Sequence, residues 1–280
     1  MSPKIITVIG SLNIDLVTLT PRVPTGGETL TATSFSTGPG GKGANQAVAC
    51  ARLSRPNPAS APSHTSDVLV KMIGAVGDDE FGPSLISSLK DSLIDTTSIQ
   101  TIPSPIHRAP SSPPPSQPPP PSAPPSPPLR LPDSAYPSIT HLILNETEAA
   151  ILTSRPVSAV EDPSFDWRVV TDEFLSKGVK TVIVTLGSKG AILATSKTYT
   201  HIPAESNIKV VDTTAAGDTF VGAYAVDLVR HTSSNTQSAD HDKILLSAVQ
   251  KACKAAARTV EKEGAQSAIP WADEIDVKRD

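Results

Sequence analysis

The sequence predicts an α/β fold in which a mostly parallel sheet is covered by helices on both faces. The first observation is the unbroken run of mainly β-branched residues Ile5–Ile9, which is typical of a strand buried on both sides. The second is the alternation of apolar strand-like runs with helical segments after residue 138, which favours parallel strands joined by helices. Ligands of such sheets bind beyond the carboxyl ends of the strands, so we expect the functional site there.

A proline-rich tract divides the chain. Sixteen of the 28 prolines fall within residues 103–137 of the 280-residue sequence. Proline lacks a backbone N–H and disfavours helix in the residue before it, so the tract predicts a polyproline II or disordered linker. We therefore expect an N-terminal part at residues 1–102 and a C-terminal part of the same domain at residues 138–280.

The N-terminal part is expected to contain strands around a glycine-rich turn. Ile5–Ile9 and Val68–Val76 are apolar enough for buried strands, whereas Thr29–Ser36 alternates like a half-exposed one. Leu16–Leu19 is expected to be extended. The sequence GPGGKGANQAVACARL predicts a turn leading into an Ala-rich helix, and Phe81–Leu93 has helical periodicity.

The C-terminal part alternates strand and helix. The expected strands are Ile139–Leu144, Thr181–Leu186, Ala191–Ala194 and Ile208–Val211. The expected helices are one starting at Glu146–Leu152, Trp167–Lys177 closed by Gly178, one from DTTAAGDTF to about Arg230, and His241–Glu263.

Composition excludes several classes of function. A net charge of −4 argues against a nucleic-acid-binding surface, and no stretch approaches the ~20 apolar residues of a membrane span. Cys50 and Cys253 lie far apart, with neither metal-ligand spacing nor a disulfide framework. The start of the sequence has no long apolar segment with a cleavage site. We therefore expect an intracellular protein.

The segment Asp212–Asp218, DTTAAGD, is the strongest candidate for chemistry. It lies before an Ala- and Gly-rich helix, whose first-turn N–H groups and dipole suit a transferring phosphoryl group. Asp218 stands where it could accept the proton of a nucleophilic hydroxyl. Alternatively, Asp218 only stabilises the helix N-terminus.

The segment Gly38–Asn45, GPGGKGAN, is the second candidate. It formally matches G-x-G-x-x-G, but no acidic residue follows about 20 positions on, and Lys42 precedes glycine, which excludes a P-loop. The glycines would let the backbone approach a polyhydroxyl ligand, with Lys42 and Asn45 supplying hydrogen bonds. The alternative is a plain tight turn with a solvated lysine.

Polar residues follow two other expected strands. Asn13 and Asp15 can point to one side and hold sugar hydroxyls, or simply cap a turn. Asn145 and Glu148 start a helix, so that a cation could lie near Glu148, or the two could form a capping arrangement.

The turn Thr185–Gly190, TLGSKG, joins two expected strands. Its backbone could hold nucleotide phosphates, although by itself it reads as an ordinary hairpin. None of the histidines has a metal partner at i+3 or i+4, so we expect them at the surface.

In their order along the chain, these pieces resemble the ribokinase or PfkB-type sugar kinase family. The matching stretches are GSLNID, RVPTGGETL, GGKGANQAVA, IGAVGDDEFG, LNETEA, VIVTLGSKGA, VDTTAAGDTFVGA and EGAQSAIPW. The resemblance implies a ribokinase-like doubly wound sheet with a small β-lid that is incomplete here. It also implies transfer of the ATP γ-phosphoryl group to O5 of D-ribose, in D-ribose catabolism.

The resemblance assigns a role to each motif. Asp218 would be the base, and the anion hole would be Ala215, Ala216 and Gly217. The sugar would be held by Asn13, Asp15, Gly41, Lys42, Gly43, Ala44, Asn45 and Asp218. The ATP pocket would be lined by Asn145, Thr185, Leu186, Gly187, Ser188, Lys189, Gly190, Gly217, Asp218 and Cys253. Glu148 would organise Mg²⁺, and K⁺ would be bound around Asp212, Thr214, Thr259, Lys262, Gly264 and Ala268.

The chain also departs from the family pattern. Cys253 replaces a histidine and Ala268 a serine that relatives often carry. Between about Leu93 and Ile139, relatives carry two further lid strands and two parallel strands, where this chain has the proline tract. The alternatives are therefore an impaired or non-catalytic relative, with Pro115–Pro118 as a ligand for SH3-type domains, or a kinase for another sugar or nucleoside. We expect a cytoplasmic protein, and the sequence leaves open whether it also enters the nucleus. Relatives often form homodimers through the lid, but the lid of this chain is incomplete, which argues against the same dimer here.

Overall fold

The computed structural model of the chain describes residues 4–61, 66–103, 131–231 and 238–276. The chain forms two compact units. Unit 1 comprises Met1–Ile102, Gly187–Ala191 and His201–Asp280, and unit 2 comprises Pro103–Leu186 and Ile192–Thr200. The final 80 residues therefore group with the N-terminal part. Among the described helices, none is both long and apolar enough for a membrane-spanning segment.

Unit 1 is built on a parallel sheet in the order β1 (Lys4–Ile9), β4 (Val68–Gly77) and β5 (Asp95–Ile102). β1 and β4 are in register along the whole of β1, with Lys4 opposite Val68. Both strands were expected from their apolar runs, and both are confirmed. β5 was not expected, because its first residues, DTTS, are polar. It follows α2 (Gly82–Asp91), which was expected at Phe81–Leu93.

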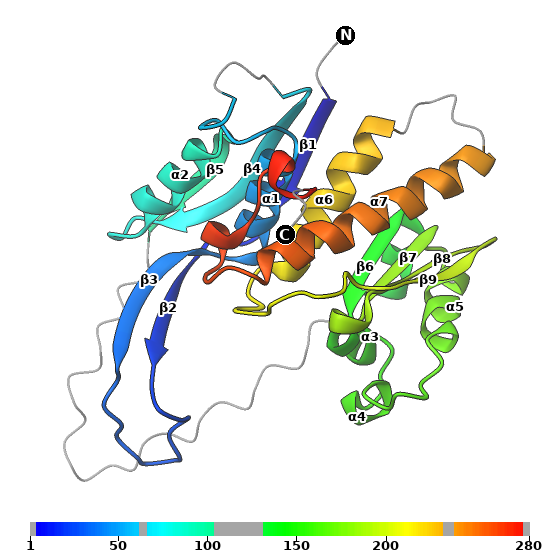
Figure 1. Cartoon of the computed structure of the whole chain (residues 1–280), viewed down its shortest axis with the longest axis horizontal. Helices are drawn as coiled ribbons and strands as arrows, with labels where there is room; N and C mark the ends of the chain where they lie inside the picture. The colour runs from blue at the N-terminus through cyan, green and yellow to red at the C-terminus, as the bar shows by residue number, and fades with distance from the viewer. Residues whose placement is uncertain (1–3, 62–65, 104–130, 232–237, 277–280) are drawn as a thin grey trace. The chain divides into compact units, whose positions relative to one another are not determined.

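A separate two-stranded ribbon consists of β2 (Asn13–Leu19) and β3 (Ser34–Gly40), which are antiparallel (Figure 1). The expectation of a strand at Thr29–Ser36 was wrong in its bounds. The register places Asn13 opposite Gly40 and Leu19 opposite Ser34. Because β2 ends at Leu19, the residues before Ser34 have no strand to pair with.

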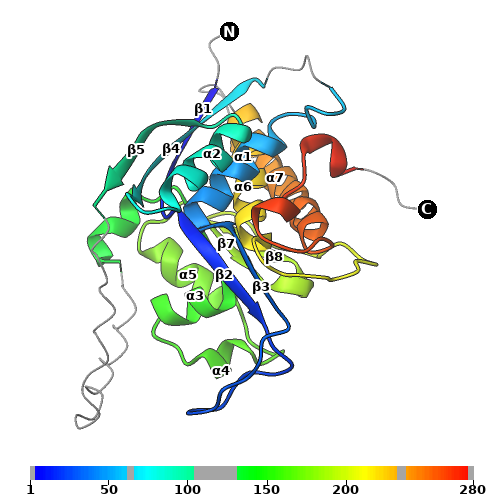
Figure 2. The same cartoon turned by 90° about the vertical axis from the view of Figure 1, so that its left-hand side faces the viewer.

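Besides α2, unit 1 contains the helices α1 (Lys42–Leu53), α6 (Ala216–His231) and α7 (Ser238–Thr259). α1 and α6 lie side by side (Figure 1 and Figure 2). Contacts between them advance in the same direction along both helices, namely Asn45 with Asp218, Cys50 with Gly222 and Ser54 with Arg230. The two helices are therefore parallel, and their N-termini lie at the same end of the pair.

The packing of α1 on α6 depends on Gly222. A Cβ at this position would stand 2.9 Å from the Cys50 amide nitrogen and would also overlap the Ala49 side chain. Ala49 and Cys50 are both buried. Glycine at 222 therefore lets the two helix backbones approach each other directly.

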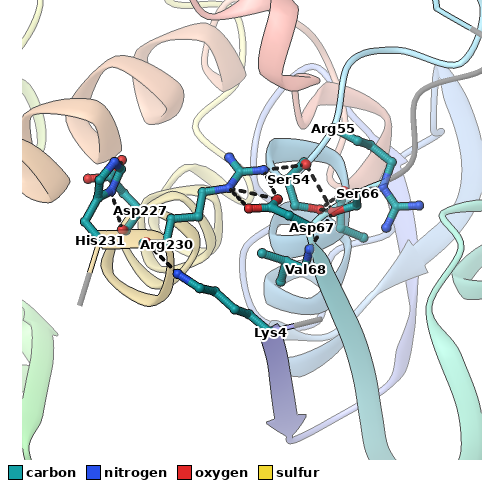
Figure 3. Close-up of polar contacts among 10 residues, drawn as sticks. Lys4, Ser54, Arg55, Ser66, Asp67, Val68, Asp227, Arg230 and His231 are labelled. Atoms are coloured by element: carbon teal, nitrogen blue, oxygen red, sulfur yellow. Dashed lines mark hydrogen bonds and ion pairs between the residues drawn. The ribbon is translucent and has the colours of Figure 1, made fainter. Parts of the chain in front are cut away.

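Arg230 anchors the C-terminal end of α6 (Figure 3). Its guanidinium donates to both carboxylate oxygens of Asp67, at 2.6 Å from Nη2 to Oδ1 and 3.1 Å from Nε to Oδ2, and to the Ser54 carbonyl at 2.7 Å. The Arg230 carbonyl accepts from the Lys4 ammonium at 2.5 Å. These contacts tie α6 to the end of α1 and to the starts of β1 and β4.

A second sheet has the strand order β6 (His141–Asn145), β7 (Thr181–Thr185), β8 (Ala191–Thr195) and β9 (Tyr199–Ile202). β6, β7 and most of β8 belong to unit 2, whereas Ala191 and the last two residues of β9 are grouped with unit 1. β6 and β7 are parallel, as expected. Three helices accompany these strands: α3 (Glu146–Leu152), α4 (Val157–Val160) and α5 (Arg168–Ser176). The core includes Phe174, Trp167 and Tyr136.

The end of the predicted linker is ordered. Asp133–Ser138 forms a 3-10 helix, η1, and Tyr136 is 2 % exposed with its ring 5.6 Å from that of Phe174. The expectation of a disordered linker is therefore wrong for residues 133–137. An apolar ring that packs into a core outweighs the backbone preference of the neighbouring prolines. Residues 104–130, including the Pro115–Pro118 motif, lie outside the described residues.

The α/β class and the parallel pairing are confirmed, but the strands do not form one continuous sheet. In the described part of the chain, β1, β4 and β5 form one hydrogen-bonded sheet and β6 to β9 another. The expected strand Ile208–Val211 is absent, and this segment is irregular. Val210 and Val211 are 62 % and 53 % exposed, because no strand pairs with them. The Val211 amide instead donates to the Val260 carbonyl at 2.7 Å.

Candidate functional site

The glycine-rich turn before α1 packs directly on the end of β1. A Cβ on Gly43 would stand 2.7 Å from the Gly10 Cα, and Gly41 has φ +91° with the Asn13 amide nitrogen 2.7 Å from its hypothetical Cβ. The Ala44 amide donates to the Ser11 carbonyl at 3.0 Å. Glycine is required here by close backbone contact and by a positive φ. This packing places the N-terminus of α1 beside the start of β2.

Asn13 and Asp15 lie on β2, next to this turn. They are paired in register with Gly40 and Gly38 of β3, respectively. The Asp15 carboxylate covers Gly40, where a Cβ would stand 2.6 Å from Oδ1. Asn13 and Lys42 are exposed, and Asp15 is half-buried. The structure thus brings the predicted sugar-binding residues of both motifs to one place.

The N-terminus of α6 begins with a strained residue. Ala215 has φ +60°, and its carbonyl accepts from the Thr219 amide at 2.8 Å, so the chain turns sharply into the helix. A non-glycine residue in this region is uncommon and costs about 1–2 kcal/mol. Gly217 is exposed, and a Cβ there would meet no atom within 4 Å. The first turn of α6 therefore faces open space on the side of Gly217.

The Asp218 carboxylate is held by two side-chain amides from α1. Asn45 Nδ2 donates to Oδ2 and Gln46 Nε2 donates to Oδ1, both at 3.1 Å. Asp218 is half-buried and lies in the first turn of α6. Asn45 and Asp218 were both predicted site residues, and the structure confirms that they are adjacent.

Gln46 was missed by sequence reasoning. The only indication in the sequence that Gln46 belongs to the site was its position directly after Asn45 in the GGKGANQ motif. Successive residues of a helix point about 100° apart, so the sequence favoured Asn45 alone. Only the close approach of α1 and α6 shows that the longer side chain reaches the same carboxylate.

Asn45 carries an unsatisfied acceptor. Its residue is 5 % exposed, and its Oδ1 atom is buried without a hydrogen-bond partner among the described residues. Leaving such an atom unpaired costs about 1–3 kcal/mol. A ligand hydroxyl that donates a hydrogen bond to Oδ1 would remove this cost.

Asp212 joins two loops of unit 1. Its Oδ1 accepts from the Thr214 amide at 2.9 Å and from the Thr214 hydroxyl at 2.7 Å, and its Oδ2 accepts from the Gly264 amide at 2.9 Å. The Thr214 hydroxyl above all, and then the two amides, hold the pKa of Asp212 below its usual value. Both carboxylate oxygens of Asp212 therefore accept hydrogen bonds within the protein.

The other predicted cation residues have individual roles. The buried Thr259 hydroxyl contacts the Thr219 hydroxyl at 2.9 Å and donates to the Ala255 carbonyl at 3.2 Å, so it is used within the protein. The Lys262 ammonium pairs with Glu274 at 3.1 Å. Ala268 is fully buried in the 3-10 helix η3 (Gln266–Ala268). In the described residues, no three His, Cys, Asp or Glu side chains form a metal-binding group.

In unit 2, Asn145 and Glu148 form a capping box at the start of α3. Asn145 Oδ1 accepts from the Glu148 amide at 2.8 Å, and Glu148 Oε2 accepts from the Asn145 amide at 3.0 Å. The capping arrangement that the sequence left open is therefore present. The Thr185 hydroxyl at the end of β7 donates to the Leu144 carbonyl at 3.3 Å, and Leu186 is buried in the core of unit 2.

The turn Gly187–Gly190 belongs to unit 1. Gly187 and Gly190 have φ of +53° and +97°, and a Cβ on Gly190 would stand 2.6 Å from the Ala204 amide nitrogen. Ser188 is exposed, and the Lys189 carbonyl contacts His201 Nε2 at 2.7 Å. Cys253, in α7 of the same unit, is buried, which raises the pKa of its thiol to about 11.

Comparison with known proteins gives one consistent result. The model of the family described as "pfkB family carbohydrate kinase" matches residues 4–106 and 118–272. The ribokinase of Schizosaccharomyces pombe is 32 % identical over 328 aligned positions, which cover 97 % of this chain and 96 % of the relative. Because the chain has 280 residues, at least 48 of those positions hold no residue of it.

Two further similarities extend this result. The deoxyribokinase of Salmonella typhi is 32 % identical over 320 positions, which cover 95 % of each chain. The structure of Arabidopsis thaliana ribokinase complexed with ribose and ATP matches with a TM-score of 0.71 at 23 % identity, over 98 % of each chain. The structural likeness concerns the fold.

Proposed function

Because the chain belongs to the pfkB family of carbohydrate kinases, we propose that it transfers the γ-phosphoryl group of ATP to O5 of D-ribose. The products are D-ribose 5-phosphate and ADP. The observation that carries this proposal is the Asp218 carboxylate, held by Asn45 and Gln46 in the first turn of α6. The ribokinase relative and the solved structure with ribose and ATP support the choice of substrates.

Asp218 is the general base of the proposed reaction. The O5 oxygen forms a bond to the γ-phosphorus, the bond from that phosphorus to the bridging oxygen of ADP breaks, and the O5 proton passes to Asp218. Two neutral amide donors favour the ionised carboxylate, which is the form that can accept this proton.

The start of α6 provides the anion hole. Ala215, Ala216 and Gly217 lie at the positive end of the α6 dipole. The Ala216 amide donates to the Thr213 carbonyl at 3.3 Å, so its role as a donor to the phosphoryl group requires this contact to open. The open space beside Gly217 leaves room for the phosphoryl group. Fixed donors of this kind stabilise the charge that develops on the transferring oxygens.

The sugar is held beside the base by residues of β2 and the α1 turn. The buried Asn45 Oδ1 accepts one sugar hydroxyl. The Asp15 carboxylate and the Asn13 amide hold others, and the backbone of the α1 turn lies against the sugar. The residues of this turn are Gly41, Lys42, Gly43 and Ala44.

Nucleotide and cations use the remaining predicted residues. In unit 2, Asn145, Thr185 and Leu186 would contact ATP, and Glu148 would organise Mg²⁺, which neutralises phosphate charge when bound. In unit 1, the turn Gly187–Gly190 and Cys253 would contact ATP. A monovalent cation would bind at the loops that Asp212 joins, around Thr214 and Gly264.

Two other functions have specific support. The deoxyribokinase relative is as similar in sequence as the ribokinase, so deoxyribose is the second candidate substrate. The gap of at least 48 aligned positions and the division of the strands into two sheets favour an impaired enzyme.

The test uses the purified full chain with ATP, Mg²⁺ and K⁺. We expect ribose 5-phosphate to form faster than deoxyribose 5-phosphate, and Asp218→Asn to lower kcat about 10²- to 10⁴-fold. A higher kcat/KM for deoxyribose than for ribose would identify deoxyribose as the preferred substrate. A chain that unfolds cooperatively but transfers no phosphoryl group to any pentose would establish the impaired relative.

A further inference from the structure

Each oxygen of the Asp218 carboxylate accepts a hydrogen bond from a different, consecutive residue of α1. Asn45 Nδ2 lies 3.1 Å from Oδ2, and Gln46 Nε2 lies 3.1 Å from Oδ1. Both donors are uncharged, so they orient the carboxylate without neutralising it. A carboxylate held at both oxygens has its plane fixed.

The two amides differ in what else they can do. Asn45 is 5 % exposed and has a buried Oδ1 without a partner among the described residues, which points to a ligand hydroxyl. Gln46 is only half-buried, and no unsatisfied buried atom of its side chain is found. Asn45 is therefore suited to substrate contact, and Gln46 to the support of Asp218.

Side-chain length explains the choice of residues. Neighbouring positions of α1 point about 100° apart, so one of the two side chains must reach further to meet the same carboxylate. Glutamine has one more methylene group than asparagine. An asparagine at position 46 would be too short for the contact that Gln46 makes.

We propose that Gln46 is a positioning residue for the base: it fixes the Asp218 carboxylate so that Oδ2, on the Asn45 side, is presented to the substrate hydroxyl. This inference rests on the proposed function, in which Asp218 takes the O5 proton. Gln46 acts through Asp218 and does not itself touch the sugar.

Contacts other than that of Gln46 with Asp218 hold α6 in place against α1. α6 is held against α1 at Gly222, and its far end is anchored by Arg230 to Asp67 and Ser54. We therefore expect replacement of the half-buried Gln46 side chain to leave the position of α6 unchanged. The effect of such a replacement falls on the orientation and protonation of Asp218.

The experiment compares Gln46→Met, which keeps the unbranched length but cannot donate, with Gln46→Glu, which adds a like charge, and Gln46→Asn, which is too short. For Gln46→Met we expect kcat to fall about 10- to 100-fold, the loss of one hydrogen bond to a charged group, with less than about a threefold change in the ribose KM. The acid limb of the kcat profile should move to higher pH, because the protonated carboxyl is then favoured. Gln46→Glu should move this acid limb furthest. Gln46→Asn should lower kcat as Gln46→Met does, because its side chain is too short to reach Asp218.

A double-mutant cycle with Asp218→Asn distinguishes a role of Gln46 in positioning Asp218 from a general structural effect of the Gln46 substitution. In the Asp218→Asn background, Gln46→Met should have no further effect on kcat, because the group on which it acts is gone. Thermal unfolding of each variant checks that the fold is kept, and a variant that does not fold is replaced by the next of the three.

The outcomes for the two proposals are distinct. If the unmodified chain does not phosphorylate ribose, or if Asp218→Asn leaves kcat unchanged, the proposed function fails. If the chain is active and Asp218→Asn lowers kcat as expected, but Gln46→Met keeps the normal kcat and pH profile, the positioning role is overturned and the proposed function stands. Additive losses in the cycle would also overturn it.

Discussion

Gly222 of α6 lies so close to α1 that a methyl group on its Cα would stand 2.9 Å from the Cys50 amide nitrogen. We expect Gly222→Ala to force the helices apart, to lower the free energy of unfolding by about 1–3 kcal/mol, and to reduce activity by separating Asp218 from Asn45. Urea unfolding and initial rates measure both effects. Gly26→Ala is the matched control, since a Cβ there meets nothing within 4 Å. Equal stability of the two variants would contradict the close packing.

The Asp212 carboxylate ties the loop before α6 to Gly264. We expect Asp212→Ala to raise the potassium concentration for half-maximal activity about tenfold, because the loop carbonyls are no longer held in place by charge-assisted hydrogen bonds. A titration of kinase activity with K⁺ gives this value. Asp276→Ala, at a carboxylate that is 83 % exposed, serves as the control. An unchanged potassium requirement would place the cation elsewhere.

Leu93 ends α2 in a left-handed conformation with φ +58°. The Leu93 and Ile94 amides donate to the Lys90 and Leu89 carbonyls at 2.8 and 3.1 Å, which is a Schellman motif. Leu93 is 61 % exposed, so Leu93→Gly removes strain and little packing. We expect stability to rise by about 1 kcal/mol. Thermal unfolding should show the opposite change for Gly178→Ala, where glycine already has φ +101°.

Asp67 contributes stability that depends on pH. The hydrogen bonds from Arg230 hold the pKa of Asp67 below its usual value, so the ionised form is favoured in the folded chain. Its contribution is present above the pKa of the unfolded state and is lost as the pH falls through the folded-state pKa. We expect Asp67→Asn to destabilise the chain at pH 7 by at most about 1 kcal/mol, since this side chain is 56 % exposed.

Unfolding curves between pH 7 and pH 3 provide the measurement for Asp67. The difference from the unmodified chain should shrink towards acid pH. A difference that stays constant over this range would show that the charge of Asp67 is not what stabilises α6.

The two cysteines should be inert in the folded chain. Burial raises the pKa of the Cys50 thiol to about 12 and that of Cys253 to about 11, so almost no thiolate exists at pH 8. We expect reaction with a thiol-specific disulfide reagent only after denaturation, when both cysteines react. Rapid labelling of the native chain at pH 8 would contradict their burial.

Much of the fold could be predicted from local pattern. α1 and β4 follow from a glycine-rich turn before an Ala-rich segment and from a continuous apolar run. The predictions were wrong where a neighbouring strand, rather than the local sequence, determines whether a segment is a strand. Ile208–Val211 is as β-branched as a buried strand, yet it has no strand to pair with and remains irregular. β5 has polar residues at its start and is a strand because β4 lies beside it.

The candidate site was predictable to the extent that its residues share motifs. Asn45 and Asp218 came from separate motifs, and their contact follows from the packing of two helices that lie far apart in the sequence. Gln46 could not be found in this way, since its reach depends on that packing. For Asn145 and Glu148 the sequence left two interpretations open, and the capping box is what the structure contains.

Ala215 lies at the start of α6 and has a positive φ. This backbone conformation limits which amino acids can replace alanine at position 215. Branched or bulky replacements would add steric repulsion to a conformation that is already costly, whereas glycine would relieve it. Glycine should therefore be the best tolerated replacement at residue 215, and asparagine or aspartate should be tolerated better than β-branched residues. Backbone shape alone, before any ligand binds, imposes this restriction.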